Sequence, residues 1–336
     1  MKAAVLTEAR NISYQTVPDP VLEPTNIIIK VKACGICGSD LHVYKGGTLK
    51  NAIMGHEFSG EVAKVGSQVS DIKTGERVIA AAYKPCGECY SCKHGAPHRC
   101  TSMLLGGFQI PGAMAEYTAI PFAQLNRNVF RISDKISYEE GAMIEPVSVG
   151  YGSIRRAQPK PEDTAVVIGA GVIGLGTIQV LKAMEVKKVI ASGHRQKRLE
   201  LAKLSGADVV IDATKQDTLS AVKEATSGLG PDVVFECAGT PETFNQSIQM
   251  VRGGGKVMIV GVYEAPLTWN PSVTIDKNLT IIGTLGGSFP KTLAFLEAGK
   301  LNTPPLITHK FPLSQAKEAF ETQITARDAV KVMFKM

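Results

Sequence analysis

Thr164-Ala-Val-Val-Ile-Gly-Ala-Gly-Val-Ile-Gly-Leu-Gly176 is the stretch that decides the fold of this chain. Its first part, Ala165 to Ile168, is a short apolar run typical of a fully buried strand. Its last part opens a segment, Val172 to Met184, that has the apolar spacing of a helix. The stretch therefore predicts a strand that runs through a glycine-rich turn straight into a helix.

The glycines of this turn follow the pattern of a dinucleotide-binding site. Gly169 permits the tight turn, Gly171 lets the backbone approach a pyrophosphate, and Gly174 lets helix and strand pack closely. The first helical amides, at Val172 and Ile173, then face the phosphates. A tight turn without a ligand is the alternative, but the strand before the turn and the helix after it favour a dinucleotide.

Strand patterns alternate with helical segments from about residue 155 to 284. Six such strands are expected, at residues 165–169, 188–192, 208–212, 231–236, 256–261 and 279–284. Strands joined in this way by helices predict an α/β fold with a doubly wound, parallel, six-stranded sheet.

The first 150 residues have a different pattern, with many turns and short β segments such as Asn26 to Ala33 and Phe58 to Val65. They predict a small β-barrel or sandwich-like domain. A chain of 336 residues is long enough for two such domains. We expect a catalytic domain over residues 1–152, a dinucleotide-binding domain over 153–285, and a C-terminal segment, 286–336, that returns to the first domain.

Composition indicates an ordinary soluble globular protein. Apolar residues make up 44% and charged residues 20%, and the formal charge of +6 is spread without a long basic run. Nothing in this charge pattern indicates a nucleic acid or a membrane as a partner. The N-terminal segment lacks the apolar core of a signal peptide, so we expect a cytoplasmic protein.

Four of the seven cysteines lie within fifteen residues: Cys86, Cys89, Cys92 and Cys100. Four thiolates at these separations can surround one tetrahedral zinc ion and leave no open position, which predicts a structural metal site. In a reducing compartment such a cluster indicates metal and not disulfides. His94 and His98 lie inside this loop and are expected to be solvated.

A second group of metal-ligating residue types lies earlier in the chain. Cys34 and Cys37 are followed by His56, nineteen residues after Cys37, and by Glu57. Thiolate, imidazole and carboxylate are ligands that a catalytic zinc accepts while one position stays open. Spacing alone leaves scattered barrel residues as an equal alternative. Glu145 is a lone carboxylate in an apolar setting, which is costly unless it is paired or bound to metal; a solvated helix end is the alternative.

Together these motifs resemble the zinc-dependent medium-chain dehydrogenase/reductase family over essentially the whole chain. The motifs are Cys34-x-x-Cys37-Gly-Ser-Asp-x-His42, Gly55-His-Glu57, the four-cysteine loop, Ile144-Glu-Pro146 and the glycine-rich turn. Within that family the chain is most similar to the sorbitol, butanediol and threonine dehydrogenase branch. The resemblance implies a GroES-like β-barrel catalytic domain followed by a Rossmann domain.

The resemblance also implies roles for single residues. Cys37, His56, Glu57 and Glu145 match the catalytic zinc ligands, with Glu145 bound directly or through water, while Cys34 belongs to the core. Two further residues, Ser39 and His42, match the proton relay, and Asp40 matches the residue that orients the ligand histidine. With the structural site, this implies two zinc ions per chain.

The implied activity is hydride transfer between a nicotinamide cofactor and a secondary alcohol or polyol, with zinc acting as a Lewis acid. The sorbitol enzymes carry an arginine just after the last sheet strand, where this chain reads Gly283-Thr-Leu-Gly-Gly287, so a polyol is not specified. A zinc-free quinone or enone reductase would not need the two cysteine-containing motifs, and a zinc ribbon for nucleic acid would need a basic stripe. A homodimer or homotetramer is implied, paired through the strand at 279–284.

The cofactor preference can be predicted from the end of the second strand. A carboxylate that binds the ribose 2′-hydroxyl is expected there, about twenty residues beyond the glycine turn. This chain has Gly193 instead, followed by His194, Arg195, Lys197 and Arg198. Because the macrodipole disfavours cations at a helix N-terminus, a bound 2′-phosphate would offset their repulsion. We therefore expect NADP(H) to be preferred over NAD(H), with Arg198 and either His194 or Arg195 binding the phosphate.

Overall fold

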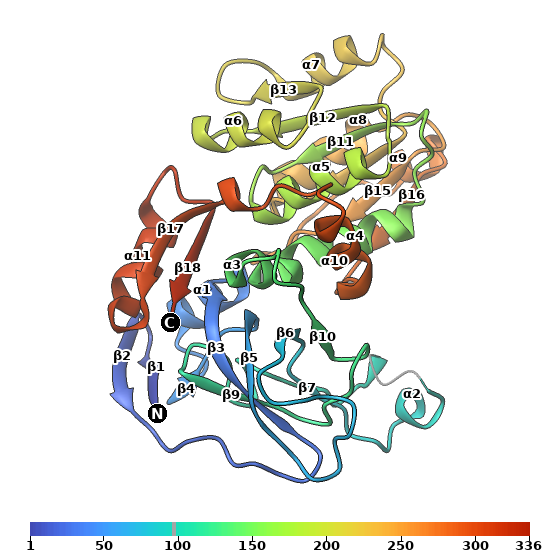
Figure 1. Cartoon of the computed structure of the whole chain (residues 1–336). Helices are drawn as coiled ribbons and strands as arrows, with labels where there is room; N and C mark the ends of the chain where they lie inside the picture. The colour runs from blue at the N-terminus through green and yellow to red at the C-terminus, as the bar shows by residue number, and fades with distance from the viewer. Residues whose placement is uncertain (96–98) are drawn as a thin grey trace. The chain divides into compact units, whose positions relative to one another are not determined.

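The computed structural model describes residues 1–95 and 99–336, and the chain forms two compact units (Figure 1). The first unit combines Met1–Glu145 with Ile307–Met336, and the second is Pro146–Leu306. The sequence places the corresponding boundaries near residues 152 and 285. Residues 286–306 lie in the second unit, because this segment includes helix α10 (Phe289–Glu297) and Asn302, whose backbone N–H donates to Gln179 (2.7 Å).

A seven-stranded sheet forms the centre of the first unit. Its strand order is β10-β6-β5-β3-β18-β17, and β9 also pairs with β3. The neighbouring pairs are antiparallel except for β17 and β18. The bounds are β3 (Ile27–Gly35), β5 (Glu57–Val65), β6 (Arg77–Ala80), β9 (Tyr117–Ile120), β10 (Val129–Arg131), β17 (Ile307–Pro312) and β18 (Lys331–Lys335).

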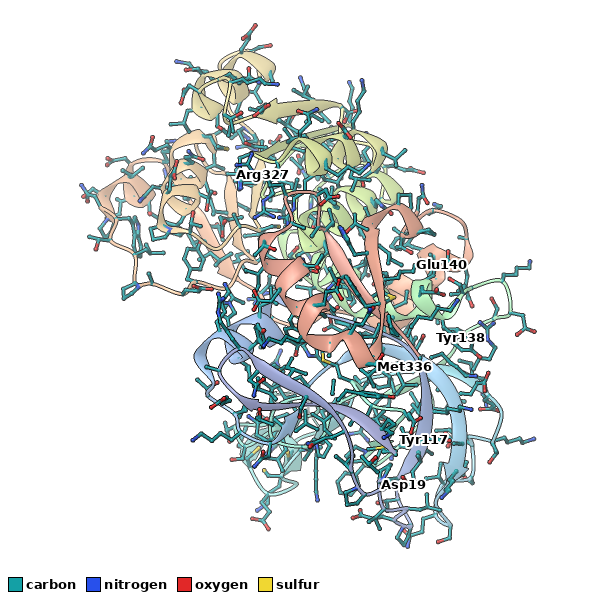
Figure 2. The ribbon with its side chains drawn as sticks, turned by 90° about the vertical axis from the view of Figure 1, so that its left-hand side faces the viewer. Asp19, Tyr117, Tyr138, Glu140, Arg327 and Met336 are labelled. Atoms are coloured by element: carbon teal, nitrogen blue, oxygen red, sulfur yellow. The ribbon has the colours of Figure 1, made fainter. Side chains whose placement is uncertain are left out.

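The C-terminal segment supplies two strands and a helix to this unit. The terminal Met336, labelled in Figure 2, donates its backbone N–H to the carbonyl of Lys32 on β3 (3.1 Å). Helix α11 (Ala316–Thr325) packs its Phe320 ring against Tyr44, with ring centroids 4.8 Å apart. Both rings are buried, so residues almost three hundred positions apart share one apolar core.

Shorter elements complete the first unit. Two small sheets have the orders β2-β1-β4 and β7-β8. The strands are β1 (Lys2–Glu8), β2 (Asn11–Thr16), β4 (Ala52–Ile53), β7 (Tyr83–Lys84) and β8 (Leu104–Leu105), and the helical segments are α1 (Gly38–Gly46), α2 (Tyr90–Lys93), α3 (Tyr138–Ala142) and the 3₁₀ turn η3 (Leu313–Gln315).

The second unit is a parallel six-stranded sheet with the order β13-β12-β11-β14-β15-β16. Its central strands are almost wholly buried, as expected when helices cover both faces of a sheet. The strands are β11 (Thr164–Ile168), β12 (Lys188–Gly193), β13 (Val209–Asp212), β14 (Val233–Glu236), β15 (Lys256–Ile259) and β16 (Thr280–Gly283). The remaining helical segments are α4 (Ile144–Ala157), α5 (Val172–Ala183), α6 (Gln196–Leu204), α7 (Thr218–Ala225), α8 (Pro241–Met250), α9 (Ser272–Asp276) and η2 (Pro304–Leu306).

The strand order confirms the doubly wound fold expected from the sequence. Strand β11 pairs with β12 on one side and with β14 on the other, so the winding reverses between β11 and β14. In open α/β sheets, ligands bind outside the carboxyl ends of the strands at such a reversal. Among the described helices, none is both long enough and apolar enough to span a membrane.

Candidate metal centres and dinucleotide seat

The pairing of β3 with β5 brings the first candidate metal ligands together. Gly35 at the end of β3 lies opposite Glu57 at the start of β5, so Cys37 and His56 meet at the same edge of the sheet. One ligand atom from each of Cys37, His56 and Glu57 lies within 4.8 Å of the other two. A side chain at Gly35 would prevent this arrangement, because its Cβ would lie 2.4 Å from the Glu57 carboxylate.

Helix α1 holds the residues that support this cluster. Cys37 is the residue before its first turn, and its backbone N–H donates to Asp40 (2.9 Å). The other Asp40 oxygen lies 3.7 Å from His56 Nδ1, and neither of these buried atoms has a hydrogen-bond partner among the described residues. A carboxylate behind a histidine is how proteins orient a metal-ligating imidazole.

The Cys34 side chain differs from that of Cys37 in being fully buried. Cys34 is fully buried within the apolar core of the first unit. A Cβ at Gly55 would lie 2.7 Å from its sulfur, which shows how closely the backbone packs against it. Burial raises the pKa of Cys34 well above its ordinary value, so it stays a thiol. Only a thiolate binds zinc well, which favours Cys37 as the ligand.

The charges around the cluster fit a divalent cation. Burial acts to lower the pKa of His56, but Cys37 and Asp40 outweigh it and raise the pKa well above its ordinary value. Burial raises the pKa of Glu145 to about 7, and Glu57 adds to the shift. The raised pKa values show that the anionic forms of the thiol and carboxyl groups here are costly to bury without a counterion, and a bound zinc would lower that cost. The donor types and the charge therefore both suit zinc.

A buried ion pair that the sequence analysis missed holds Glu57. Lys331 on β18 donates its ammonium group to one Glu57 oxygen (2.5 Å) and to the carbonyl of Ile36 (2.8 Å). Both side chains of the pair are almost fully buried. The other Glu57 oxygen, Oε1, is buried and has no hydrogen-bond partner among the described residues, as expected of an atom that faces a metal position. The signal in the sequence is a single lysine inside the apolar run Ala329-Val-Lys-Val-Met-Phe334.

The proposed relay residues also lie on α1. Ser39 and His42 are three residues apart on this helix, so their side chains share one side of it. Both are half-buried. Glu145 lies in the first turn of α4, and His56 and Glu57 shift its pKa, but it is not among the residues whose ligand atoms lie within 4.8 Å of one another.

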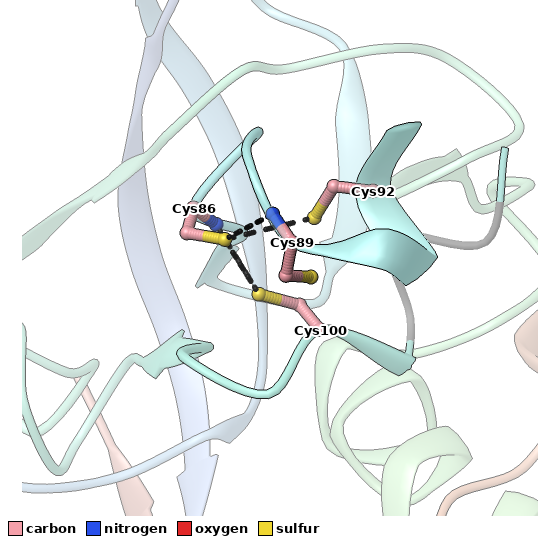
Figure 3. A group of neighbouring side chains, drawn as sticks. All are labelled: Cys86, Cys89, Cys92 and Cys100. Atoms are coloured by element: carbon pink, nitrogen blue, oxygen red, sulfur yellow. Dashed lines mark hydrogen bonds between the residues drawn. The ribbon is translucent and has the colours of Figure 1, made fainter. Parts of the chain in front are cut away.

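The four cysteines of the loop converge as a zinc site requires (Figure 3). All four sulfurs lie within 4.8 Å of one another, and Cys86 Sγ is 3.4 Å from Cys100 Sγ and 4.0 Å from Cys92 Sγ. Sulfurs bound to one tetrahedral zinc at about 2.3 Å would be about 3.8 Å apart. All four are free thiols, and their spacing is far longer than a disulfide bond.

The polypeptide around these cysteines supports thiolates. Backbone N–H groups of Cys86, Cys89 and Ser102 donate to sulfurs of the group. Backbone hydrogen bonds, first that of Cys92, lower the pKa of Cys89 to about 6, whereas burial raises the pKa of Cys92 to about 12. Without a cation the four groups would not all ionise, so metal binding would release protons. His94 is exposed, as expected, and stacks on Tyr90, while His98 lies outside the described residues.

The glycine-rich turn in the second unit has the geometry of a phosphate-binding site. Gly169 has a φ of +96°, and a Cβ at Gly174 would lie 2.0 Å from the carbonyl oxygen of Gly169. Gly171, by contrast, faces open space: the nearest atom to its Cβ position is a guanidinium nitrogen of Arg198, at 3.9 Å. Gly171 caps α5, so the amides of Val172 and Ile173 point toward the same space.

Cations surround the end of β12, where a ribose-binding carboxylate is absent. Gly193 ends this strand, Arg195 is the N-cap of α6, and the first turn of α6 has no acidic residue. Burial, and then the charge of Arg195, lower the pKa of Arg198 to about 10. Asp212 lies opposite Gly193 on the neighbouring strand β13. Its carboxylate accepts hydrogen bonds from Thr214 and forms an ion pair with Lys215, so it is engaged by the loop that follows its own strand.

A glycine turn at a reversal of strand order and a separate cysteine, histidine and carboxylate cluster define a zinc-type oxidoreductase. Residues 23–130 match the alcohol dehydrogenase GroES-like domain, and residues 172–298 match the zinc-binding dehydrogenase domain. The chain belongs to the zinc-type medium-chain alcohol dehydrogenase family, in the branch that contains sorbitol and other polyol dehydrogenases and threonine dehydrogenases.

Relatives and solved structures cover nearly the whole chain. Sorbitol dehydrogenase from Bacillus subtilis is 36% identical over 99% of this chain and 96% of its own length. L-idonate 5-dehydrogenase from Vitis vinifera is 34% identical over 99% and 94%. A zinc-binding dehydrogenase from Sinorhizobium meliloti, solved with NADP, has a TM-score of 0.93 at 29% identity over 100% and 99%. An alcohol dehydrogenase from Escherichia coli, solved with NADH, has a TM-score of 0.91 at 30% identity over 100% and 99%.

The buried ion pair gives a prediction for stability. Lys331→Met leaves Glu57 buried without its counter-charge, so we expect the metal-free protein to lose about 3–5 kcal/mol of unfolding free energy. The loss should be smaller in zinc-loaded protein, because a divalent cation would replace the missing charge. Denaturant unfolding with and without a chelator measures both values.

Lys335→Met is the matched control, since it makes the same change at an exposed position of the same strand. It should leave stability nearly unchanged. Similar small losses for Lys331→Met and Lys335→Met would show that the ion pair does not stabilise this unit.

Proposed function

We propose that this chain is a zinc- and nicotinamide-dependent dehydrogenase that converts a secondary alcohol or polyol to a carbonyl compound, or the reverse, and that it prefers NADP(H). One observation carries the proposal: ligand atoms of Cys37, His56 and Glu57 lie within 4.8 Å of one another. Two buried atoms of this group, His56 Nδ1 and Glu57 Oε1, have no hydrogen-bond partner among the described residues. Relatives named as sorbitol and L-idonate dehydrogenases support the substrate class.

Cys37, His56, Glu57 and Glu145 would hold the catalytic zinc. When bound, zinc supplies Lewis acidity toward an alcohol or carbonyl oxygen, and the nicotinamide supplies a hydride acceptor or donor. The side chains of this protein would orient the metal ligands and transfer the proton. Asp40 orients the His56 ring. In the oxidative direction, Ser39 would accept the hydroxyl proton of the substrate at Oγ and give up its own proton toward His42. One ring nitrogen of His42 would take up a proton while the other releases one to water.

The loop of Cys86, Cys89, Cys92 and Cys100 would hold a second, structural zinc, because four thiolates leave no position for a substrate. Such a site stabilises a loop that buries little apolar surface of its own. Free thiols persist in a reducing compartment, so we place the enzyme in the cytoplasm.

The metal assignment is tested by two matched substitutions of cysteine. Cys37→Ser should lower the zinc content from about two ions per chain to about one, and should reduce alcohol oxidation by at least about a hundredfold, because it removes a ligand. Cys34→Ser makes the same change in the core and should keep both ions. Elemental analysis and cofactor absorbance, with secondary alcohols and polyols as substrates, measure the two effects. Equal losses in the two variants would refute the assignment of Cys37, and zinc-free active enzyme would refute the mechanism.

The NADP(H) preference is tested at Arg198 and Gly193. Arg198→Ala should raise the Michaelis constant for NADP(H) by about ten- to a hundredfold, the worth of one charge-assisted hydrogen bond, with little effect on NAD(H). Gly193→Asp should shift preference toward NAD(H); the new Cβ would lie 3.2 Å from a Leu199 methyl, so this side chain must shift slightly to admit it. Lys197→Ala, at an exposed position of the same helix, is the control.

Two outcomes would contradict this preference. Wild-type enzyme with higher catalytic efficiency for NAD(H) than for NADP(H) would overturn it directly. Equal loss of both cofactors in Arg198→Ala would assign this guanidinium to the pyrophosphate, which its position near Gly171 makes the competing interpretation.

Assembly into a homodimer or homotetramer is the last part of the proposal. Strand β16 lies at the edge of the six-stranded sheet, and Leu285, just beyond it, is 98% exposed. An exposed edge with apolar neighbours favours pairing with a second copy across a two-fold axis. Light scattering at micromolar concentration should give the mass of two or four chains, and a monomer would contradict this expectation.

A further inference from the structure

Glu236 is a buried carboxylate at the carboxyl end of β14 that neither the metal centre nor the glycine turn uses. It is fully buried, and the four groups that donate hydrogen bonds to it within the described part of the chain are all uncharged. Oε1 accepts from the backbone N–H groups of Ala238 (2.8 Å) and Gly239 (2.9 Å) and from the Thr243 hydroxyl (2.8 Å). Oε2 accepts from the Tyr263 hydroxyl (2.6 Å). A carboxylate suits this role because it accepts several donors and donates none.

These bonds fix the loop that follows β14. Two come from the loop itself, and a third comes from Thr243 in the first turn of α8, so the end of the strand, the loop and the start of the helix are tied to one group. The fourth bond reaches Tyr263, beyond the end of β15. Burial, followed by the bond to Glu236, raises the pKa of Tyr263, which keeps its hydroxyl protonated as a donor. Glu236 therefore couples the loops after two neighbouring strands.

The same loop packs directly against the glycine-rich turn. Cys237 donates its N–H to the carbonyl of Ile168 (2.8 Å), and a Cβ at Gly169 would lie 2.9 Å from the backbone nitrogen of Ala238. On its other side, a Cβ at Gly261 would lie 2.3 Å from the nitrogen of Gly239. The loop is thus held between the turns after β11 and β15, beside the reversal of strand order.

A dinucleotide at such a reversal lies across both halves of the sheet. The turn after β11 receives the pyrophosphate, and the end of β12 receives the ribose of the adenosine half. The other half of the cofactor therefore extends over the carboxyl ends of β14 and β15, whose loops Glu236 ties together.

We propose that Glu236, with Tyr263, is a positioning residue for the nicotinamide half of the cofactor. It acts through the loop of residues 237–240, which it holds in one conformation, and it leaves the adenosine half unaffected. This inference rests on the proposed function, since it requires a nicotinamide dinucleotide in this seat.

The test compares a whole cofactor with the fragment that lacks the nicotinamide ring. Calorimetric titration measures the affinity of NADPH and of 2′-phospho-ADP-ribose, and of NADH and ADP-ribose. Glu236→Gln should weaken dinucleotide binding by about tenfold, because one strong acceptor becomes a neutral amide, and should leave fragment binding within about threefold. Tyr263→Phe should produce a smaller loss of the same kind and serves if Glu236→Gln does not fold.

Glu242→Gln is the matched control, because it makes the same chemical change at an exposed position in the first turn of α8. It should leave both affinities unchanged. Equal weakening of dinucleotide and fragment, or no weakening in the Glu236 and Tyr263 variants, would overturn the inference. Wild-type protein that binds neither dinucleotide would instead overturn the proposed function, and this inference with it.

Discussion

The register between β3 and β5 is the constraint on which the candidate metal centre depends. Because Gly35 lies opposite Glu57, the two strands present Cys37 and His56 at one edge, although nineteen residues separate them in the sequence. A shift of one residue would turn the alternating side chains to the other face and separate the ligands. The third strand of the arrangement, β18, pairs with β3 on its other side and carries Lys331 to the same carboxylate. The ends of three strands thus specify the cluster.

Burial of charge explains why these strands must meet. An unpaired carboxylate inside the protein is costly, and breaking a buried pair usually destabilises a protein more than the pair stabilises it. Lys331 neutralises one side of Glu57, while Oε1 and the neighbouring His56 and Asp40 atoms remain without hydrogen-bond partners among the described residues. Buried polar atoms without partners destabilise a protein, but the same atoms are suitable ligands, or partners of ligands, for a metal ion.

The second unit uses a different means of burying a carboxylate. Glu236 is satisfied by backbone amides and hydroxyl groups, with no lysine or arginine among the four donors. Two of these donors are backbone amides of the loop after β14, so this carboxylate ties the loop beside Gly169 to the end of the strand. Glu57 thus leaves one oxygen available to a cation, whereas both oxygens of Glu236 accept hydrogen bonds that tie down a loop. The surroundings of each carboxylate, and not its residue type, decide which role it takes.

The sequence by itself determined the parts of this protein whose signals are local. Strand and helix periods predicted the six-stranded sheet, and the glycine spacing predicted the turn whose close packing at Gly174 the structure confirms. The spacing of the four cysteines predicted a loop whose sulfurs converge, because their ligand set is closed within fifteen residues. Only the tertiary structure decided what depends on distant pairing. Lys331 and Glu57 are 274 positions apart, and Glu236 at the end of β14 meets Tyr263 beyond the end of the neighbouring strand β15. No local pattern encodes such contacts, because sheet register and chain topology bring the partners together after each segment has formed.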